Sequence, residues 1–475
     1  MKKLLAIILI FMMLLSIGAC SSDDSSEESV SKTNEEKSND DGEPTKIVFW
    51  GLNPEQIGSG NKEMIEAFHE AYPNLEIDAQ STPGTEGNNY STQDVTKLLA
   101  AIAAGNPPDV AVLDRFMVSQ FASRGALSPL DPYMDQSDFD INEYEGYTVD
   151  EVTFDSKVWA LPTGTDTRIL YWNKEAFRNA GLDPEKPPKT WDELLEYSKK
   201  LTAFDADGKI EKIGFIPNYG NSWLYLYGFQ NGGQFLSDDG RTAMLNQPEI
   251  VEALEFMVEG YDLGGGAEKI NTFKQDLQGG ADDPFINGIV GMKIDGNWTI
   301  GSIARYKPDL DFACAIAPTP DENTDPITWA GGWSYCIPKN AKHAKEGFEA
   351  IKYVTTDGML IQAEASAKYN KEEQGSQYYI PSLAAHKPTA EKLFEKYVEG
   401  LDNPALKDAF QVAFDAKSVA LHRPVSPVGG ILWTEHERAI DKAIYKELTA
   451  QEALDAGNEV VQTELDKFWS DYDNK

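Results

Sequence analysis

Apolar strands and amphipathic helices alternate at the start of the folded part of this chain, and their order constrains the fold more than any other feature. Apolar runs predict strands at 46–50, 75–79 and 107–113. Between them, apolar residues at helical spacing predict helices at 61–72 and 94–104. Strand–helix–strand order at this spacing is typical of a parallel α/β sheet, so we expect an α/β fold.

The composition excludes several classes of function. The chain has 475 residues and a formal net charge of −36, which is unsuited to neutralising nucleic-acid phosphates. About 430 residues follow residue 45, enough for two or three domains or one two-lobed protein. The sequence contains no P-loop, no GxSxG and no HExxH motif. We therefore expect neither an enzyme nor a nucleic-acid-binding protein, and no cofactor.

The N-terminus resembles a lipoprotein signal. Two lysines precede an apolar run of 12 residues, 4–15, which suits a signal peptide and is too short to span a bilayer. Gly18 and Ala19 then precede Cys20, as in a bacterial lipobox. This resemblance implies that 1–19 is a signal peptide and that Cys20 carries the lipid that holds the protein to the bilayer. A plain secretory signal with an incidental cysteine is the alternative.

An acidic, low-complexity segment follows Cys20. Residues 21–43 contain nine acidic residues, two lysines and no aromatic residue. Such a composition does not bury enough apolar surface to offset chain entropy, so we expect 20–45 to be a disordered tether.

Several motifs downstream, taken together, resemble one protein family. Their order and spacing are similar to those of extracellular solute-binding proteins (family 1) of ABC transporters for sugars, the group that includes maltose-binding protein. The segments that carry the resemblance are Leu98–Val110 (with Ala-Gly-Asn-Pro-Pro-Asp), Trp159–Pro162, Leu170–Lys174, Pro188–Leu194 and Phe285–Trp298.

The resemblance implies a periplasmic-binding-protein-like fold. In it, two discontinuous α/β lobes are joined by hinge strands, and the ligand lies in the cleft between them. We expect the first lobe to comprise 46–162 and the return segment 329–374, and the second lobe to comprise 163–328 and most of 375–475. The resemblance also implies a monomer that passes its ligand to the permease subunits.

Sugars present apolar C–H faces, which flat aromatic rings can cover. Trp298 and Trp433 stand where the family commonly has a stacking aromatic residue. The other aromatic candidates for ligand contact, which lie in loops by pattern, are Trp223, Trp333, Trp50, Trp329 and Tyr219. For each tryptophan the alternative is a buried core residue. The number of candidates favours an oligosaccharide over a monosaccharide.

Sugar hydroxyls need carboxylate or guanidinium partners. Asp114 and Arg115 resemble the Asp-Arg-Phe of maltodextrin binders, with a surface salt bridge as the alternative. Asp166 stands at the spacing of the family's acidic ligand residue, and Asp295 precedes the Gly-x-Trp motif. Ala111 replaces an expected aromatic residue, which argues against maltose itself.

Other functions remain open from the sequence. A different solute, such as glycerol phosphate or a polyamine, is the main alternative, and a secreted glycosidase or an adhesion lipoprotein is a further one. Because a receptor without an outer membrane around it must be tied near its permease, we expect it on the extracellular face of a Gram-positive cytoplasmic membrane.

Two smaller features leave alternatives as well. Cys314 and Cys336 are either two buried thiols or a disulfide. Residues 205–208 (Asp-Ala-Asp-Gly) resemble the start of a calcium loop but lack its glutamate at the twelfth position. We predict a turn there rather than a metal site.

Overall fold

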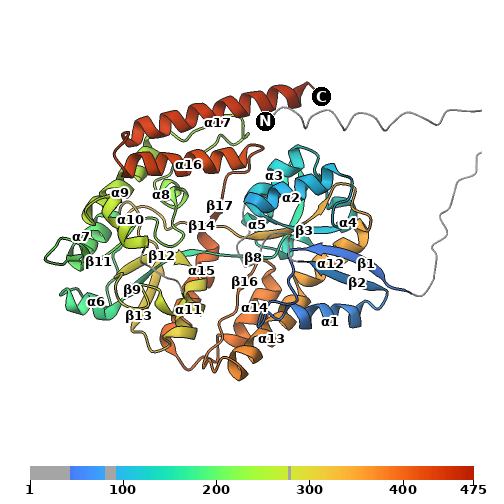
Figure 1. Cartoon of the computed structure of the whole chain (residues 1–475), viewed down its shortest axis with the longest axis horizontal. Helices are drawn as coiled ribbons and strands as arrows, with labels where there is room; N and C mark the ends of the chain where they lie inside the picture. Colours follow the sequence, from blue (N-terminus) through green and yellow to red (C-terminus); the bar gives the residue numbers. More distant parts are fainter. Residues whose placement is uncertain (1–42, 81–91, 276–279, 475) are drawn as a thin grey trace, which may run out of the picture. The chain divides into compact units, whose positions relative to one another are not determined.

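The computed structural model describes residues 43–80, 92–275 and 280–474. Within these residues, the chain forms two main sheets with helices packed around each (Figure 1). We call the part around the first sheet lobe 1 and the part around the second sheet lobe 2. Cys20, the predicted signal peptide and most of the predicted tether lie outside the described residues. Among those described, no helix combines the length and hydropathy needed to cross a membrane.

The lobe 1 sheet has six strands. These are β1 (Thr45–Trp50), β2 (Leu75–Gln80), β3 (Val110–Asp114), β4 (Leu127–Ser128), β7 (Ala160–Pro162) and β15 (Trp333–Pro338). β1 is parallel to β2 and β3, whereas β15 is antiparallel to β3, β4 and β7. The predicted parallel unit is therefore confirmed. β3 begins at Val110 and not at 107, because Pro107 and Pro108 have no backbone N–H for the ladder.

The lobe 2 sheet has three strands. They are β9 (Arg168–Asn173), β12 (Met292–Gly296) and β13 (Phe312–Ile316). β9 lies in the middle and is antiparallel to both neighbours. All six residues of β9 are buried, which explains a nearly continuous apolar run where a half-exposed strand would alternate.

Short strand pairs mark the places where the chain passes between the lobes. β8 (Gly164–Thr165) pairs with β16 (Leu383–Ala384), and β14 (Thr328–Ala330) pairs with β17 (Ala420–His422). The chain leaves the first sheet after β7, enters the second at β9 and returns through β14 to β15. Lobe 1 is therefore discontinuous, as the resemblance implied. The segment boundaries given above stay predictions.

Helices make up most of the remaining structure, and α16 and α17 lie side by side (Figure 1). The α-helices are α1 (Asn61–Ala71), α2 (Thr92–Ala103), α3 (Arg115–Ser123), α4 (Asp131–Met134), α5 (Gly146–Glu151), α6 (Lys174–Asn179), α7 (Trp191–Leu201), α8 (Leu224–Gln230), α9 (Pro248–Leu263), α10 (Ala267–Gln275), α11 (Trp298–Tyr306), α12 (Ala344–Val354), α13 (Asp357–Glu372), α14 (Lys387–Tyr397), α15 (Pro404–Asp415), α16 (Gly429–Ile444) and α17 (Ala450–Asp473). Short 3₁₀ helices are Ile141–Glu143, Gly280–Asp282 and Ala416–Val419.

Two minor predictions are resolved by the structure. Cys314 on β13 and Cys336 on β15 are free thiols, so the disulfide alternative is not formed. Two hairpins complete the strands, β5 (Thr153–Phe154) with β6 (Lys157–Val158) and β10 (Ala203–Phe204) with β11 (Ile210–Lys212). In the second hairpin, Asp205 Oδ1 accepts hydrogen bonds from the backbone N–H groups of Asp207 (2.9 Å) and Lys209 (2.8 Å). The predicted turn is thus confirmed.

Candidate functional site

A cavity of about 550 Å³ lies where the lobe 1 sheet, the crossing strands and α11 of lobe 2 meet. Among the described residues that line it, Asp166 is the single acidic side chain and none is basic. The lining residues used below are Thr163, Thr165, Asp166, Asn297, Trp298, Gly301, Trp333 and Ile380. Three predicted ligand residues, Asp166, Trp298 and Trp333, are brought together here.

Trp298 is the most accessible aromatic side chain of the cavity. It is the first residue of α11, directly after β12, and its side chain is 44% exposed. Its ring folds back over Gly296, where an added Cβ would collide with the indole. The Gly-x-Trp spacing is therefore a packing requirement that holds the indole against the backbone with much of its surface open.

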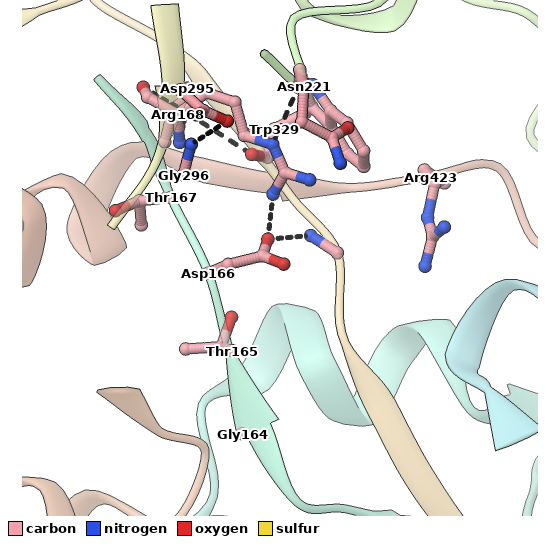
Figure 2. Close-up of polar contacts among 12 residues, drawn as sticks. Gly164, Thr165, Asp166, Thr167, Arg168, Asn221, Asp295, Gly296, Trp329 and Arg423 are labelled. Atoms are coloured by element: carbon pink, nitrogen blue, oxygen red, sulfur yellow. Dashed lines mark hydrogen bonds and ion pairs between the residues drawn. The ribbon is translucent and has the colours of Figure 1, made fainter. Parts of the chain in front are cut away.

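Asp166 is held by two donors on the lobe 2 side of the crossing. Its Oδ1 accepts a hydrogen bond from the backbone N–H of Gly331 (2.6 Å) and pairs with the guanidinium of Arg168 (Figure 2). Arg168 Nε also donates to the carbonyl of Asn221 (3.0 Å), and its guanidinium lies over the ring of Trp329. Burial lowers the pKa of Arg168, and the charge of Asp166 opposes that shift. Asp166 is thus a fixed carboxylate at the cavity wall.

Arg115 is completely buried beneath the crossing strands. Its Nε donates to Glu151 (2.7 Å), and its two terminal nitrogens donate to the carbonyls of Gly164 (2.7 Å) and Gly331 (2.5 Å). Gly332 passes so close that a Cβ there would collide with this guanidinium, and its φ of +140° also favours glycine. Arg115 therefore ties two crossing segments to lobe 1.

Arg423 completes this buried ionic network. Its Nε donates to Glu151 (2.8 Å), and its terminal nitrogens donate to Asp114 (2.5 and 3.3 Å). Burial alone would lower the pKa of Arg423, but the two carboxylates more than offset it and raise the pKa. Asp114 also caps α3 by accepting from the N–H of Phe116 (3.0 Å). The surface salt bridge given as the alternative for Asp114 and Arg115 is not formed, since each pairs with another residue, and their contact with ligand stays a prediction.

Trp223 and Trp433 form part of an aromatic cluster between α8 and α16. Their ring centroids are 5.7 Å apart, and Tyr225 and His436 stack nearby at 4.5 Å. His436 is fully buried, and burial lowers its pKa to about 3. Neither tryptophan belongs to the lining of the cavity described above, so their contact with ligand stays a prediction.

The remaining predicted residues contact protein groups. Trp329 is buried beneath Arg168, and Asp295 is buried with Lys293 (2.9 Å) and Thr299 (2.8 Å) as partners. Tyr219 has the amino group of Lys293 over its ring, at 5.3 Å. Trp50 donates from Nε1 to Gln80 (3.2 Å). Their predicted roles in binding stay untested predictions.

Sequence reasoning missed several polar residues of the cavity, among them Thr163, Thr165 and Asn297. Asn297 lies between Gly296 and Trp298, and it is only 7% exposed. Within the described part of the chain, its buried Oδ1 has no hydrogen-bond partner. Buried amide oxygens are nearly always paired, so this unpaired atom singles out Asn297 among the lining residues. Its place inside the Gly-x-Trp motif was the signal that could have identified it.

The chain belongs to the bacterial extracellular solute-binding protein family, whose sequence profile matches residues 53–360. Among curated relatives, the sn-glycerol-3-phosphate-binding periplasmic protein UgpB of Shigella flexneri serotype 5b is 28% identical over 282 residues. That alignment covers 55% of this chain and 58% of the relative. The chain therefore matches less than two thirds of the length of such relatives.

Solved structures match over a longer part of the chain. The structure of CpMnBP1 with mannotriose bound is 27% identical, has a TM-score of 0.70 and covers 88% of this chain and 100% of its own. An ABC transporter solute-binding protein from Thermotoga lettingae, bound with α-D-tagatose, is 25% identical with a TM-score of 0.65, covering 89% and 100%. The two-lobed periplasmic-binding-protein-like α/β fold expected from the sequence is confirmed.

Proposed function

We propose that the protein is the substrate-binding component of an ABC import system and that it binds a carbohydrate, in particular an oligosaccharide, in the cavity at Trp298. The observation that carries the proposal is the pairing of an open indole face with fixed polar groups at one wall. Trp298 suits the C–H face of a sugar ring, while Asp166 and Asn297 suit its hydroxyls. The sugars named for two similar structures support the same class of ligand.

Glycerol 3-phosphate is the second candidate ligand, because the curated relative cited above is named as a protein that binds it. A phosphate needs cationic or backbone N–H donors. Among the described residues of the cavity lining, none is basic. The nearby guanidinium groups of Arg115, Arg168 and Arg423 are each paired with a carboxylate. The charge of the site therefore favours a neutral ligand.

The charges of the lining residues also disfavour a polyamine as the ligand. Each ammonium group that enters a low-dielectric cavity needs its own carboxylate or hydrogen-bond acceptors. Among the described lining residues, Asp166 is the single acidic side chain and already pairs with Arg168. A neutral polyol leaves this charge balance intact.

The proposed function includes a location at the outer face of the membrane. Cys20 carries the lipid anchor, and residues 21–43 act as the tether that keeps the binding domain near the permease subunits at the outer face of a Gram-positive cytoplasmic membrane. The protein acts as a monomer without cofactor or catalytic step. Its task is binding and release, which a hinge between two lobes performs.

Calorimetric titration tests the choice of ligand. Mannobiose, mannotriose, maltose and maltotriose are each titrated against the protein. Glycerol 3-phosphate and spermidine are titrated separately, because they represent the alternative classes of ligand. At least one of the sugars is expected to bind with a Kd below 1 mM, about −4 kcal/mol or stronger. Binding of glycerol 3-phosphate or spermidine with no response to any sugar at millimolar concentration would reject the carbohydrate assignment.

A further inference from the structure

A second cavity is also lined by Trp298. Its volume is about 260 Å³, close to the lower end of the range for ligand pockets, about 300–1,000 Å³. It shares three lining residues with the larger cavity, namely Trp298, Gly301 and Ile380. We call it the Tyr306 groove, and its remaining lining residues are Ser302, Arg305, Tyr306, Asn370, Ser376, Tyr378 and Tyr379.

One face of α11 forms the floor of the Tyr306 groove. Residues 298, 301, 302, 305 and 306 have the i, i+3, i+4, i+7, i+8 spacing of a single helix face. The opposite face is buried and contains Ile300 and Ile303. At the two ends of the floor, Trp298 and Tyr306 are 44% and 41% exposed. Large aromatic side chains left open on one helix face are suited to covering apolar ligand surface.

Gly301 has no side chain and therefore leaves open space on this helix face between Trp298 and Tyr306. An added Cβ at this position would meet no atom within 4 Å. Gly301 lines both cavities, so the two adjoin at this residue. A glycine inside a helix costs up to about 1 kcal/mol relative to alanine, and no close packing at this position requires it. The open space above residue 301 is what the glycine provides.

The facing wall supplies polar groups and further rings. It is formed by the segment after α13, with Tyr378 and Tyr379 beside Ile380. Arg305 stands at the edge, where it donates to Gln374 (2.9 Å) and lies over the ring of Tyr306 at 5.2 Å. Hydroxyl, amide and guanidinium groups next to aromatic rings are the combination that a sugar ring needs.

We propose that the Tyr306 groove is a second sugar subsite. A saccharide whose first units occupy the larger cavity extends past Trp298 and over Gly301, and its next unit lies against Tyr306. This inference rests on the proposed function and adds that the site distinguishes saccharides by their chain length. The protein therefore gains affinity at one particular step of an oligosaccharide series.

Two substitutions test the proposal, and of these Tyr306→Ala changes a residue that lines the groove alone. Gly301→Leu fills the open space above residue 301, and because its Cβ meets no atom, the fold should be kept. Tyr306→Ala removes an exposed ring. Tyr445→Ala is the matched control, since that tyrosine is 42% exposed and lies outside both cavities. Circular dichroism and thermal unfolding confirm that each variant is folded.

Kd values are measured for mannose and maltose oligomers from one to four units. Wild type and Tyr445→Ala should show a threefold to tenfold gain at one chain-length step, the scale of one stacked ring. Tyr306→Ala should lose that step and keep its affinity for shorter sugars within twofold. Gly301→Leu, at a residue that lines both cavities, should lose that step as well. If sugars bind and the step persists in both groove variants, or wild type has no step, the subsite is rejected while the proposed function stands. If wild type binds no sugar, both fail.

Discussion

The guanidinium carbon of Arg168 lies 3.7 Å from the ring centroid of Trp329, and both side chains are buried. Arg168 begins β9 of lobe 2, whereas Trp329 lies on β14, the strand that leads back to lobe 1. The aromatic face and the carboxylate of Asp166 together compensate a charge that burial would otherwise make costly. One cation thus links the two crossings to the acidic residue of the cavity.

The first prediction concerns this buried charge. Arg168→Met should lower the free energy of unfolding by about 3 kcal/mol or more, because it leaves the carboxylate of Asp166 without its partner. Urea denaturation followed by tryptophan fluorescence gives the value. Arg178→Met is the control, since Arg178 and Asp311 form an exposed pair, 48% and 52% exposed, that should contribute less than about 1 kcal/mol. Equal losses in the two variants would contradict the role assigned to Arg168.

The second prediction concerns the stacking surface. Trp298→Ala should weaken sugar binding by at least about 1 kcal/mol, roughly fivefold in Kd, because a stacked ring contributes on that scale. Its loss should change stability less than the loss of a buried tryptophan, since Trp298 is already 44% exposed. Calorimetry on a sugar that binds wild type provides the measurement.

Trp469→Ala serves as the control for that experiment. Trp469 is half-buried on α17, donates from Nε1 to the carbonyl of Gly240 (3.2 Å) and lines neither cavity. It should reduce stability without changing the Kd. If Trp298→Ala binds the sugar with unchanged affinity, Trp298 does not stack on the ligand and its role is structural.

Local patterns were sufficient to predict the framework of the fold and part of the site. Strands and helices of the parallel unit follow from periodicity, because each has one face toward a core. The Gly296-x-Trp298 spacing also has a local cause, because the indole of Trp298 needs a residue without a Cβ beneath it. Such features depend on neighbours within a few residues, which a sequence displays directly.

The buried ionic network could not be predicted in the same way. Asp114 and Arg423 are 309 residues apart in the chain, and Glu151 and Arg423 are 272 apart. Nothing in the sequence around Arg423 distinguishes it from a surface arginine. The adjacent pair Asp114–Arg115 suggested an ion pair, yet the residues point to different partners because Asp114 ends a strand and Arg115 begins a helix. Such pairings depend on tertiary geometry.

The third prediction concerns the anchor. Cys20→Ser should release the protein from the membrane fraction into the medium, because serine lacks the thiol that accepts the lipid. Immunoblots of membrane and medium fractions measure the distribution, and sugar binding by the released protein should equal that of wild type. Cys336→Ser, which changes a buried thiol in lobe 1, should leave the protein in the membrane fraction. Retention of the Cys20→Ser variant would count against a lipid anchor at this residue.

The fourth prediction concerns the pH dependence of stability. His436 is fully buried against Tyr225, and burial lowers its pKa from 6.5 to about 3. Between these values the unfolded chain binds a proton that the folded chain excludes, so stability falls as the pH drops below 6.5. From pH 7.5 to pH 5, this histidine should account for a loss of about 1–2 kcal/mol.

Urea denaturation at the two pH values isolates this contribution when His436→Phe is compared with wild type. Phenylalanine keeps the stacking on Tyr225 and has no titrating group, so the variant should lose about 1–2 kcal/mol less than wild type on acidification. His343→Phe, a change at a half-buried histidine before α12, is the comparison variant for the loss of a histidine elsewhere in the chain. If wild type and His436→Phe respond identically to acid, His436 is not held in its neutral form by the aromatic cluster, and the buried position assigned to it is wrong.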